Sequence, residues 1–148
     1  MLRWFMLICL LPITISAAEP LRVGLAEVDI TPPVGFPMAG YYHERLATGT
    51  KDPLKAKAVV FVGENAQAAW VTCDLTGIAT DLSRAVRQKA AQTTGIPVEH
   101  IILSATHSHT APDYSKALYD HLGNTAVTTR TEYAGRLIDG IVQAIVKA

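Results

Sequence analysis

Two histidines, His107 and His109, stand one residue apart in this 148-residue sequence. Neutral imidazole is a common zinc ligand, with nitrogen-to-zinc distances of about 2.0 to 2.1 Å. Alternate side chains of a strand share one face, so the two rings can meet if strand geometry persists through Ser108. One metal ion could then contact both rings, or one ring could bind metal while the other handles protons. The alternative is that both histidines are merely solvated or structural residues and bind no metal. Two histidines alone also do not complete a catalytic zinc site, which usually has three protein ligands.

The position of the pair favours a functional site. It follows the apolar run His100–Thr106, whose lack of alternation predicts a central strand covered on both faces. Ligands of open sheets bind beyond the carboxyl ends of strands, and the pair leads into a loop that contains Pro112. His43, His100 and His121 have no such support, and we interpret them as exposed or hydrogen-bonded residues.

Hydrophobic patterning predicts the first element that positions this segment. Apolar residues alternate from Leu21 to Leu25, and Val28 and Ile30 then resume on the other phase. This pattern predicts a strand with a bulge near Ala26 and Glu27.

A hairpin and a long loop are predicted next. The β-prone runs 56–62 and 67–74 are separated by Gly63-Glu64-Asn65-Ala66, which indicates a hairpin. Residues 34–53 show no clear period and hold three of the ten glycines. Long loops inside compact domains are often functional, and the equally open alternative is a surface excursion whose tyrosines cover the core.

Two helices are predicted on either side of the histidine segment. The first has Thr80 or Asp81 as its N-cap and ends at Gly95. The second begins at a capping box of Thr129 and Glu132, and its apolar residues repeat at helical spacing up to the last residues. The order of the predicted elements indicates an α/β fold, with a mixed sheet and helices packed on it.

Residues 1–18 have the features of a secretory signal peptide. Arg3 precedes an apolar run over residues 4–15, and the small residues at 16–18 suit a cleavage site. The run is shorter than the roughly 20 apolar residues that span a bilayer, and an uncleaved anchor is the alternative. We therefore expect a secreted or periplasmic protein, for which peripheral contact with a membrane surface stays open.

Charge and cysteine content narrow the function classes further. Thirteen basic and thirteen acidic side chains balance, and no basic cluster provides an electrostatic footprint for nucleic acid. We therefore expect no nucleic-acid partner.

Cys9 lies in the predicted signal peptide, which leaves Cys73 without an internal disulfide partner. Its apolar context favours a buried, inert thiol over a catalytic nucleophile.

Four segments, in the same order, resemble the start of the neutral/alkaline non-lysosomal ceramidases and their bacterial relatives. They are Val-Asp-Ile-Thr-Pro-Pro-Val-Gly at 28–35, Asp-Pro-Leu-Lys-Ala-Lys-Ala at 52–58, Thr-Cys-Asp-Leu at 72–75 and Leu-Ser-Ala-Thr-His-Ser-His at 103–109. The resemblance covers roughly residues 21 to 113, and the last helix is compatible with it. Four segments in order are more specific than any one motif.

The resemblance implies a chemistry for the two histidines. Members of that family are secreted or membrane-associated amidases that cleave the N-acyl bond of ceramide, with one zinc ion held by two histidines, a glutamate and a tyrosine. By this resemblance His107 is a zinc ligand, and His109 is a catalytic residue near the zinc and the scissile amide. The implied reaction is zinc-assisted hydrolysis of an amide-linked lipid to a fatty acid and a sphingoid base. Residues 110–113 depart from the family's Ser-Gly-Pro-Gly, so the loop beside the substrate differs.

The resemblance also implies that the chain is a part of a larger domain. The family's catalytic domain is several times longer, and its other zinc ligands lie farther along. We therefore expect residues 19–148 to be a partial N-terminal segment of a ceramidase-like catalytic domain, inactive alone, with the remaining ligands beyond residue 148. The alternative is a small secreted metal-binding or interaction domain without turnover. A (β/α)₈ amidohydrolase barrel of about 250 residues does not fit into 148.

Overall fold

The computed structural model describes residues 19–125 and 127–148, and the predicted signal peptide at 1–18 lies outside the described residues. The elements, in chain order, are β1 (Arg22–Asp29), β2 (Pro37–Met38), β3 (Arg45–Leu46), β4 (Lys55–Val62), β5 (Gln67–Cys73), α1 (Thr80–Thr94), a 3-10 turn (Val98–His100), β6 (Ile101–Ala105), α2 (Ser115–Leu122) and α3 (Thr129–Lys147). No helix of this described part is long and apolar enough to cross a membrane.

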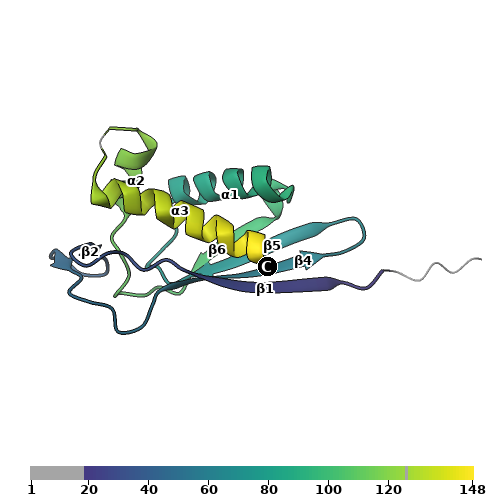
Figure 1. Ribbon diagram of the computed structural model, residues 1–148, viewed down its shortest axis with the longest axis horizontal. Coiled ribbons are helices and arrows are strands. Elements are labelled where there is room, and N and C mark those ends of the chain that lie inside the picture. Colours follow the sequence, from purple (N-terminus) through teal and green to yellow (C-terminus); the bar gives the residue numbers. More distant parts are fainter. Residues whose placement is uncertain (1–18, 126) are drawn as a thin grey trace, which may run out of the picture.

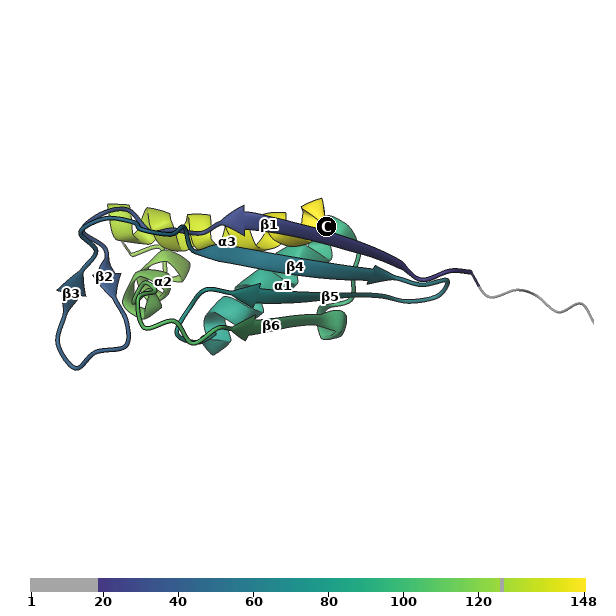
Figure 2. The same ribbon diagram turned by 90° about the horizontal axis from the view of Figure 1, so that it is seen from below.

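Four strands form one mixed sheet in the order β1-β4-β5-β6. β4 pairs antiparallel with both β1 and β5, which confirms the predicted hairpin, whereas β5 and β6 run parallel. A parallel pair needs a crossover, and α1 supplies it. The helices lie on one side of the sheet (Figure 1), and the strands stand in front of them when the molecule is seen from below (Figure 2). The predicted α/β fold is confirmed.

Two predictions about individual strands are wrong. β1 and β4 pair without interruption from Arg22↔Val62 to Asp29↔Lys55, so there is no bulge near Ala26 and Glu27. The alternation of apolar residues shifts by one position along β1 because both faces of the strand carry apolar side chains. Val28 packs against the core below the helices, whereas Leu25 is exposed on the other face. β6 is the last strand in the sheet order and not a central one. Ile102 on its outer face is 57% exposed, because helices cover only the other face.

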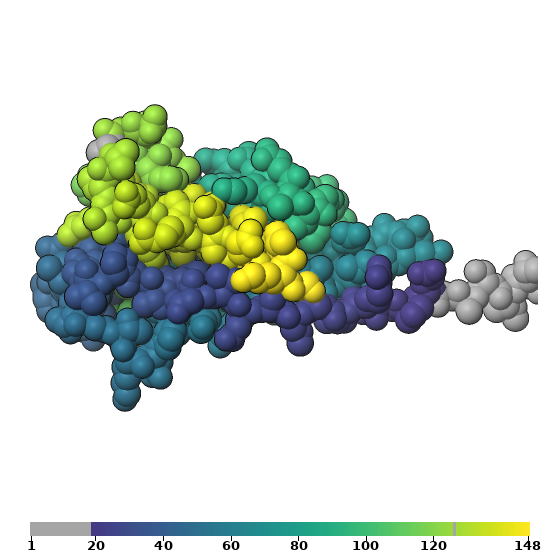
Figure 3. Space-filling view, in the orientation of Figure 1, coloured from purple at the N-terminus to yellow at the C-terminus, as the bar shows by residue number. Residues whose placement is uncertain are grey.

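The core lies between the sheet and the helices. Its buried side chains come from alternate positions of the strands and from the inner faces of the helices, and they include Ala56, Ala58, Ala69, Val71, Cys73, Leu82, Val86, Leu137, Ile141 and Ile145. Small residues let α3 approach the strands closely. A Cβ on Gly140 of α3 would stand 3.1 Å from the Ile30 side chain. The contact of α3 with β1 is visible on the surface in Figure 3.

The helix ends differ from prediction in detail. Residue Ala79 is the N-cap of α1 and makes no side-chain hydrogen bond, so neither Thr80 nor Asp81 caps the helix. Gly95 ends α1 in the left-handed conformation, with φ of 77°, as predicted. The capping box of α3 lies one residue earlier than predicted, because Thr128 and Thr131 exchange the two hydrogen bonds.

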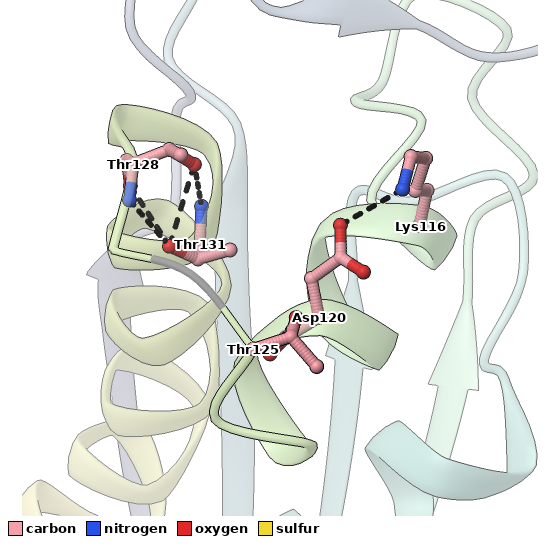
Figure 4. A network of polar contacts seen from close by, with 5 residues as sticks. All are labelled: Lys116, Asp120, Thr125, Thr128 and Thr131. Carbon is pink, nitrogen blue, oxygen red and sulfur yellow. Dashed lines mark hydrogen bonds and ion pairs between the residues drawn. The ribbon is translucent and has the colours of Figure 1, made fainter.

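The short helix α2 was not predicted. Figure 4 shows polar contacts at its end and at the start of α3. Lys116 and Asp120 form an ion pair of 2.9 Å within α2, and the Thr125 hydroxyl donates to the Asp120 carbonyl. Thr128 and Thr131 form a separate group of hydrogen bonds that begins α3.

Candidate functional site

The two histidines lie in a loop just past the carboxyl end of β6. That strand ends at Ala105, and His107 has a left-handed backbone with φ of 62°. Strand geometry therefore does not persist through Ser108, so this condition for bringing the rings together is not met. The rings come together through the turn of the loop instead. Figure 2 shows that the carboxyl ends of β1, β5 and β6 all point toward the end of the molecule that holds the β2–β3 hairpin.

The rings of His107 and His109 face one another through their Nε2 atoms. These two nitrogens are 3.2 Å apart, and the ring centroids are 4.8 Å apart at an interplanar angle of 76°. Both side chains are exposed, so solvent or a ligand can reach the point between them. The structure thus brings together the two residues that the sequence singled out.

The other ring nitrogen of each histidine is held by a backbone carbonyl. The Nδ1 of His107 lies 2.7 Å from the oxygen of Thr76, and the Nδ1 of His109 lies 3.1 Å from the oxygen of Gly40. A carbonyl only accepts, so each Nδ1 must carry the proton and donate it. Both Nε2 lone pairs then point at the same place, an arrangement that a proton or a metal cation between them stabilises. Metal-binding histidines are commonly oriented in this way by a carbonyl at the second nitrogen.

The loop of the histidines is fastened to the segment that follows β5. Thr106 and Ser108 donate their N–H groups to the carbonyls of Cys73 and Leu75, at 3.0 and 3.1 Å. The Thr76 hydroxyl donates to the Ser108 carbonyl at 2.8 Å. Because Thr76 also holds His107, this segment fixes both the backbone and the ring of the first histidine.

Asp74 strengthens the same junction. Its carboxylate accepts the N–H of Lys55 at 2.9 Å and the hydroxyl of Thr106 at 3.2 Å. It therefore ties the start of β4 to the end of β6 across the intervening strand. Its role in the described residues is to position the loop, not to contact the rings.

The long loop at residues 34–53 packs against the second histidine, which favours the functional interpretation over a mere surface excursion. Its short strands β2 and β3 form a hairpin. Ala39 donates to the Ala111 carbonyl at 2.9 Å, and the guanidinium of Arg45 donates to the His109 carbonyl at 3.0 Å. Sequence reasoning missed Thr76, Gly40 and Arg45, because nothing in their local pattern marks them as partners of distant histidines.

A cavity of about 450 Å³ adjoins the histidine loop at Thr110. Its walls come from residues 31–34 and 47–54, with apolar atoms from Val34, Met38 and Leu54 among them. A larger cavity of about 580 Å³ lies between the hairpin and the helices α2 and α3, and Gly40, which contacts the His109 ring, is part of its lining. Neither lining includes His107 or His109, and both cavities adjoin the loop of the pair.

The remaining histidines and Cys73 do not join the site. His43 is exposed and packs near Tyr41, His100 binds the Gln67 carbonyl through Nδ1 at 2.9 Å, and His121 lies against Gly135. Burial raises the pKa of the Cys73 thiol from 9.0 to about 12, so its thiolate is disfavoured. In the described residues no three His, Cys, Asp or Glu side chains form a group that could hold a metal ion.

Residues 21–148 match the family described as neutral/alkaline non-lysosomal ceramidase, N-terminal. The chain belongs to this family. It is 31% identical over 148 residues to Neutral ceramidase A of Dictyostelium discoideum, a match that covers 92% of this chain and 20% of that protein.

Two solved structures of ceramidases share the fold. The crystal structure of neutral ceramidase from Pseudomonas aeruginosa superimposes with a TM-score of 0.72 at 25% identity, over 90% of this chain and 22% of that one. A ceramidase described as complexed with C2 gives a TM-score of 0.70 at 25% identity, over 87% of this chain and 21% of that one. The chain therefore spans about a fifth of the length of these relatives.

The four ceramidase-like segments converge in the structure. The end of β1, the start of β4 and the ends of β5 and β6 lie at one edge of the sheet, through the pairs Asp29↔Lys55, Ala56↔Cys73 and Cys73↔Ala105. Segments that are far apart in the sequence thus surround the histidine loop.

Proposed function

We propose that this chain contributes the N-terminal part of the active site of a zinc-dependent amidase, which hydrolyses the N-acyl bond of a ceramide-like lipid to a fatty acid and a sphingoid base. The single observation that carries the proposal is the convergence of the His107 and His109 Nε2 atoms at 3.2 Å, with both Nδ1 atoms held by carbonyls. Membership of the ceramidase family supports the reaction class.

The donor set fits zinc. The side chain of His107 is exposed, and the Thr76 carbonyl accepts its Nδ1–H, which leaves the lone pair of Nε2 to bind a metal ion. His107 is the proposed ligand, and the remaining ligands are proposed to come from other parts of the catalytic domain. When bound, zinc supplies Lewis-acid polarisation of the amide carbonyl and activates the attacking water.

His109 is proposed as the residue that handles the proton in the reaction. Its Nδ1–H is engaged with the Gly40 carbonyl, so the basic lone pair of its Nε2 points at the reaction centre. It can accept the proton of the attacking water and deliver it to the leaving amine nitrogen. The Thr76 carbonyl holds His107 in the complementary orientation.

The cavity beside Thr110 is suited to the apolar part of such a substrate. Pro32, Val34, Met38 and Leu54 line it, and it opens beside the histidine loop. An amide carbonyl placed near the pair would leave one hydrocarbon chain free to enter this cavity. Lys51, Asp52 and Asp74 also line the cavity, so its apolar wall would face the hydrocarbon chain and its charged groups the polar part of the substrate.

The decisive experiment is a chimera in which residues 21–148 replace the matching segment of Neutral ceramidase A. We expect the chimera to release fatty acid from a fluorescent ceramide and to contain zinc. His107→Ala should remove both the metal and the activity, whereas His109→Ala should retain much of the metal and lose turnover by about 10²- to 10⁴-fold. Metal content by atomic emission and fluorescence release measure the two effects. Full zinc occupancy in the His107→Ala chimera would rule out its role as a ligand.

The isolated chain provides a second measurement. Residues 19–148 should bind zinc weakly, because two imidazoles lack the three protein ligands of a catalytic site. His100→Ala serves as the control, since this histidine is outside the pair. Zinc binding as tight as that of a structural site would contradict the proposal and favour the alternative of a small metal-binding domain.

Secretion by the predicted signal peptide is a separate proposal, tested by N-terminal sequencing of the exported protein for a start at Glu19.

A further inference from the structure

The β2–β3 hairpin holds His109 at two points. At its tip, the Gly40 carbonyl accepts the ring Nδ1–H of His109 at 3.1 Å. In its second strand, the Arg45 guanidinium donates to the backbone carbonyl of His109 at 3.0 Å. The ring and the main chain of the same residue are therefore both fixed by one small element that lies 64 to 69 residues earlier in the sequence.

Arg45 is itself held rigidly. Its guanidinium carbon lies 3.4 Å from the centroid of the Tyr41 ring, so the planar group is stacked on the aromatic face. Its Nε is buried and has no hydrogen-bond partner in the described residues. The stacking on Tyr41 and the bond to the His109 carbonyl are therefore the two contacts that place this guanidinium.

Gly40 sets the position of the ring by its lack of a side chain. It has a φ of 88°, and a Cβ at this residue would stand 2.6 to 2.7 Å from atoms of the His109 side chain. Any other residue would therefore displace the imidazole. Gly35 in the same loop has a similar φ of 82° but nothing within 4 Å of its Cβ position. The two glycines share the backbone conformation and differ in whether His109 is nearby.

We infer that the β2–β3 hairpin is a clamp in which Gly40 and Arg45 are positioning residues for His109. They keep the ring proton on Nδ1 and aim the Nε2 lone pair at His107. This inference deepens the proposed function and rests on it, because it assigns the geometry of the same histidine pair. His107 is not part of the clamp, since Thr76 holds its ring.

The test uses the whole mature chain with ¹⁵N-labelled histidine at about pH 8.5, where imidazole is neutral. Long-range proton–nitrogen NMR correlations identify the tautomer of each ring. We expect the parent chain to show the Nδ1–H tautomer for both His107 and His109. Arg45→Met and Gly40→Ala should convert His109 to a mixture of tautomers and leave His107 unchanged, because the constraint on only one ring is released.

Turnover gives the second readout, measured in the ceramidase chimera described above, because His109 is proposed to handle the proton and His107 to hold the metal. Both variants should lower kcat by about tenfold or more and keep the zinc content of the parent chimera. Gly35→Ala is the matched control for the backbone cost of Gly40→Ala, and Arg84→Met is the control for removal of a surface guanidinium. Neither control should alter the tautomers or kcat.

The outcomes separate the clamp from the proposed function. Unchanged His109 tautomers in both variants, with kcat values equal to those of the controls, would overturn the clamp. Disturbed signals of both histidines alike would also overturn it, because a general loss of structure would then explain the effect. If the parent chimera contains no zinc, the zinc proposal fails, yet the tautomer of His109 still decides the question of the clamp.

Discussion

The two faces of the sheet differ in how their residues are used. On the face toward the helices, alternate strand residues are small or aliphatic and buried, such as Ala58 and Val71. On the opposite face, Leu25 and Trp70 are exposed in the middle of their strands, and polar residues such as Lys57 and Thr72 follow toward the histidine end. The Trp70 indole, the Thr72 hydroxyl and the Ser104 hydroxyl form a hydrogen-bonded group there, with bonds of 3.0 Å.

This difference separates stability from site geometry. The covered face holds the fold together through packing, whereas the open face and its adjoining loops carry hydrogen bonds that direct side chains. Stability should therefore respond strongly to substitutions on the covered face and weakly to those on the open face. Four experiments test this contrast.

The largest expected effect compares two leucine truncations. Leu137 on α3 is 1% exposed, and Leu25 on the open face is 73% exposed. Leu137→Ala should lower the free energy of unfolding by about 2 to 5 kcal/mol, because it removes buried contacts and leaves a cavity. Leu25→Ala should change it by less than about 0.5 kcal/mol. Urea unfolding followed by circular dichroism measures both, and equal losses would end the distinction between the faces.

A buried hydrogen bond on the covered side gives the next effect. The Tyr133 hydroxyl donates to the Ile30 carbonyl at 2.7 Å. Tyr133→Phe keeps the ring packed against Phe36, where the centroids are 4.6 Å apart, and leaves the carbonyl unsatisfied. We expect a loss of about 1 to 3 kcal/mol in the free energy of unfolding. Tyr119→Phe on the exposed side of α2 is the control and should be neutral.

The third experiment measures how the free energy of unfolding changes at alkaline pH, where the buried thiol of Cys73 on the covered face contributes. Because burial raises the pKa of Cys73 from 9.0 to about 12, the unfolded chain loses its proton first as the pH rises. This contribution to stability is complete below pH 9 and declines as the pH rises toward 12, by at most about 1.4 kcal/mol per pH unit. Cys73→Ala should flatten this decline in urea midpoints measured against pH. An identical slope in the variant would show that the thiol does not titrate on unfolding.

The sequence predicted the parts of the fold that local patterns encode. The hairpin, the end of α1 at Gly95 and the course of α3 follow from alternation, helical spacing and a left-handed glycine. Strand order is not a local property, which is why β6 was expected in the centre of the sheet. α2 has only 8 residues and no side-chain cap, so it gave no clear signal.

The histidine pair was found because its two members are neighbours in the chain. Their anchors were not, because Thr76 lies 31 residues from His107 and Gly40 lies 69 residues from His109. Both anchors act through backbone carbonyls, which every residue type possesses. No pattern of side chains can therefore identify them before the fold is known.

The smallest expected effect comes from a carboxylate on the open face. The hydroxyl and N–H of Thr31 hold the pKa of the exposed Asp29 below its ordinary value of 3.8. The stability from this group is present above pH 3.8 and is lost as the pH falls through the lowered pKa. Asp29→Asn should therefore slightly flatten the acid side of the stability profile in thermal melts. A steeper acid side in the variant would contradict the assigned hydrogen bonds.

The bond between Tyr133 and Ile30 spans 103 residues and has a consequence for the order of folding. β1 is synthesised early, but the helix that covers its inner face is α3, which follows all the other described elements in the chain. A nascent chain can form the β4–β5 hairpin locally, yet β1 must wait with its apolar side uncovered. Closing such a long loop is entropically costly, so the docking of α3 on β1 is expected to be a late and slow step. A ribosome-bound chain that stops short of Thr129 would accordingly be a target for chaperones.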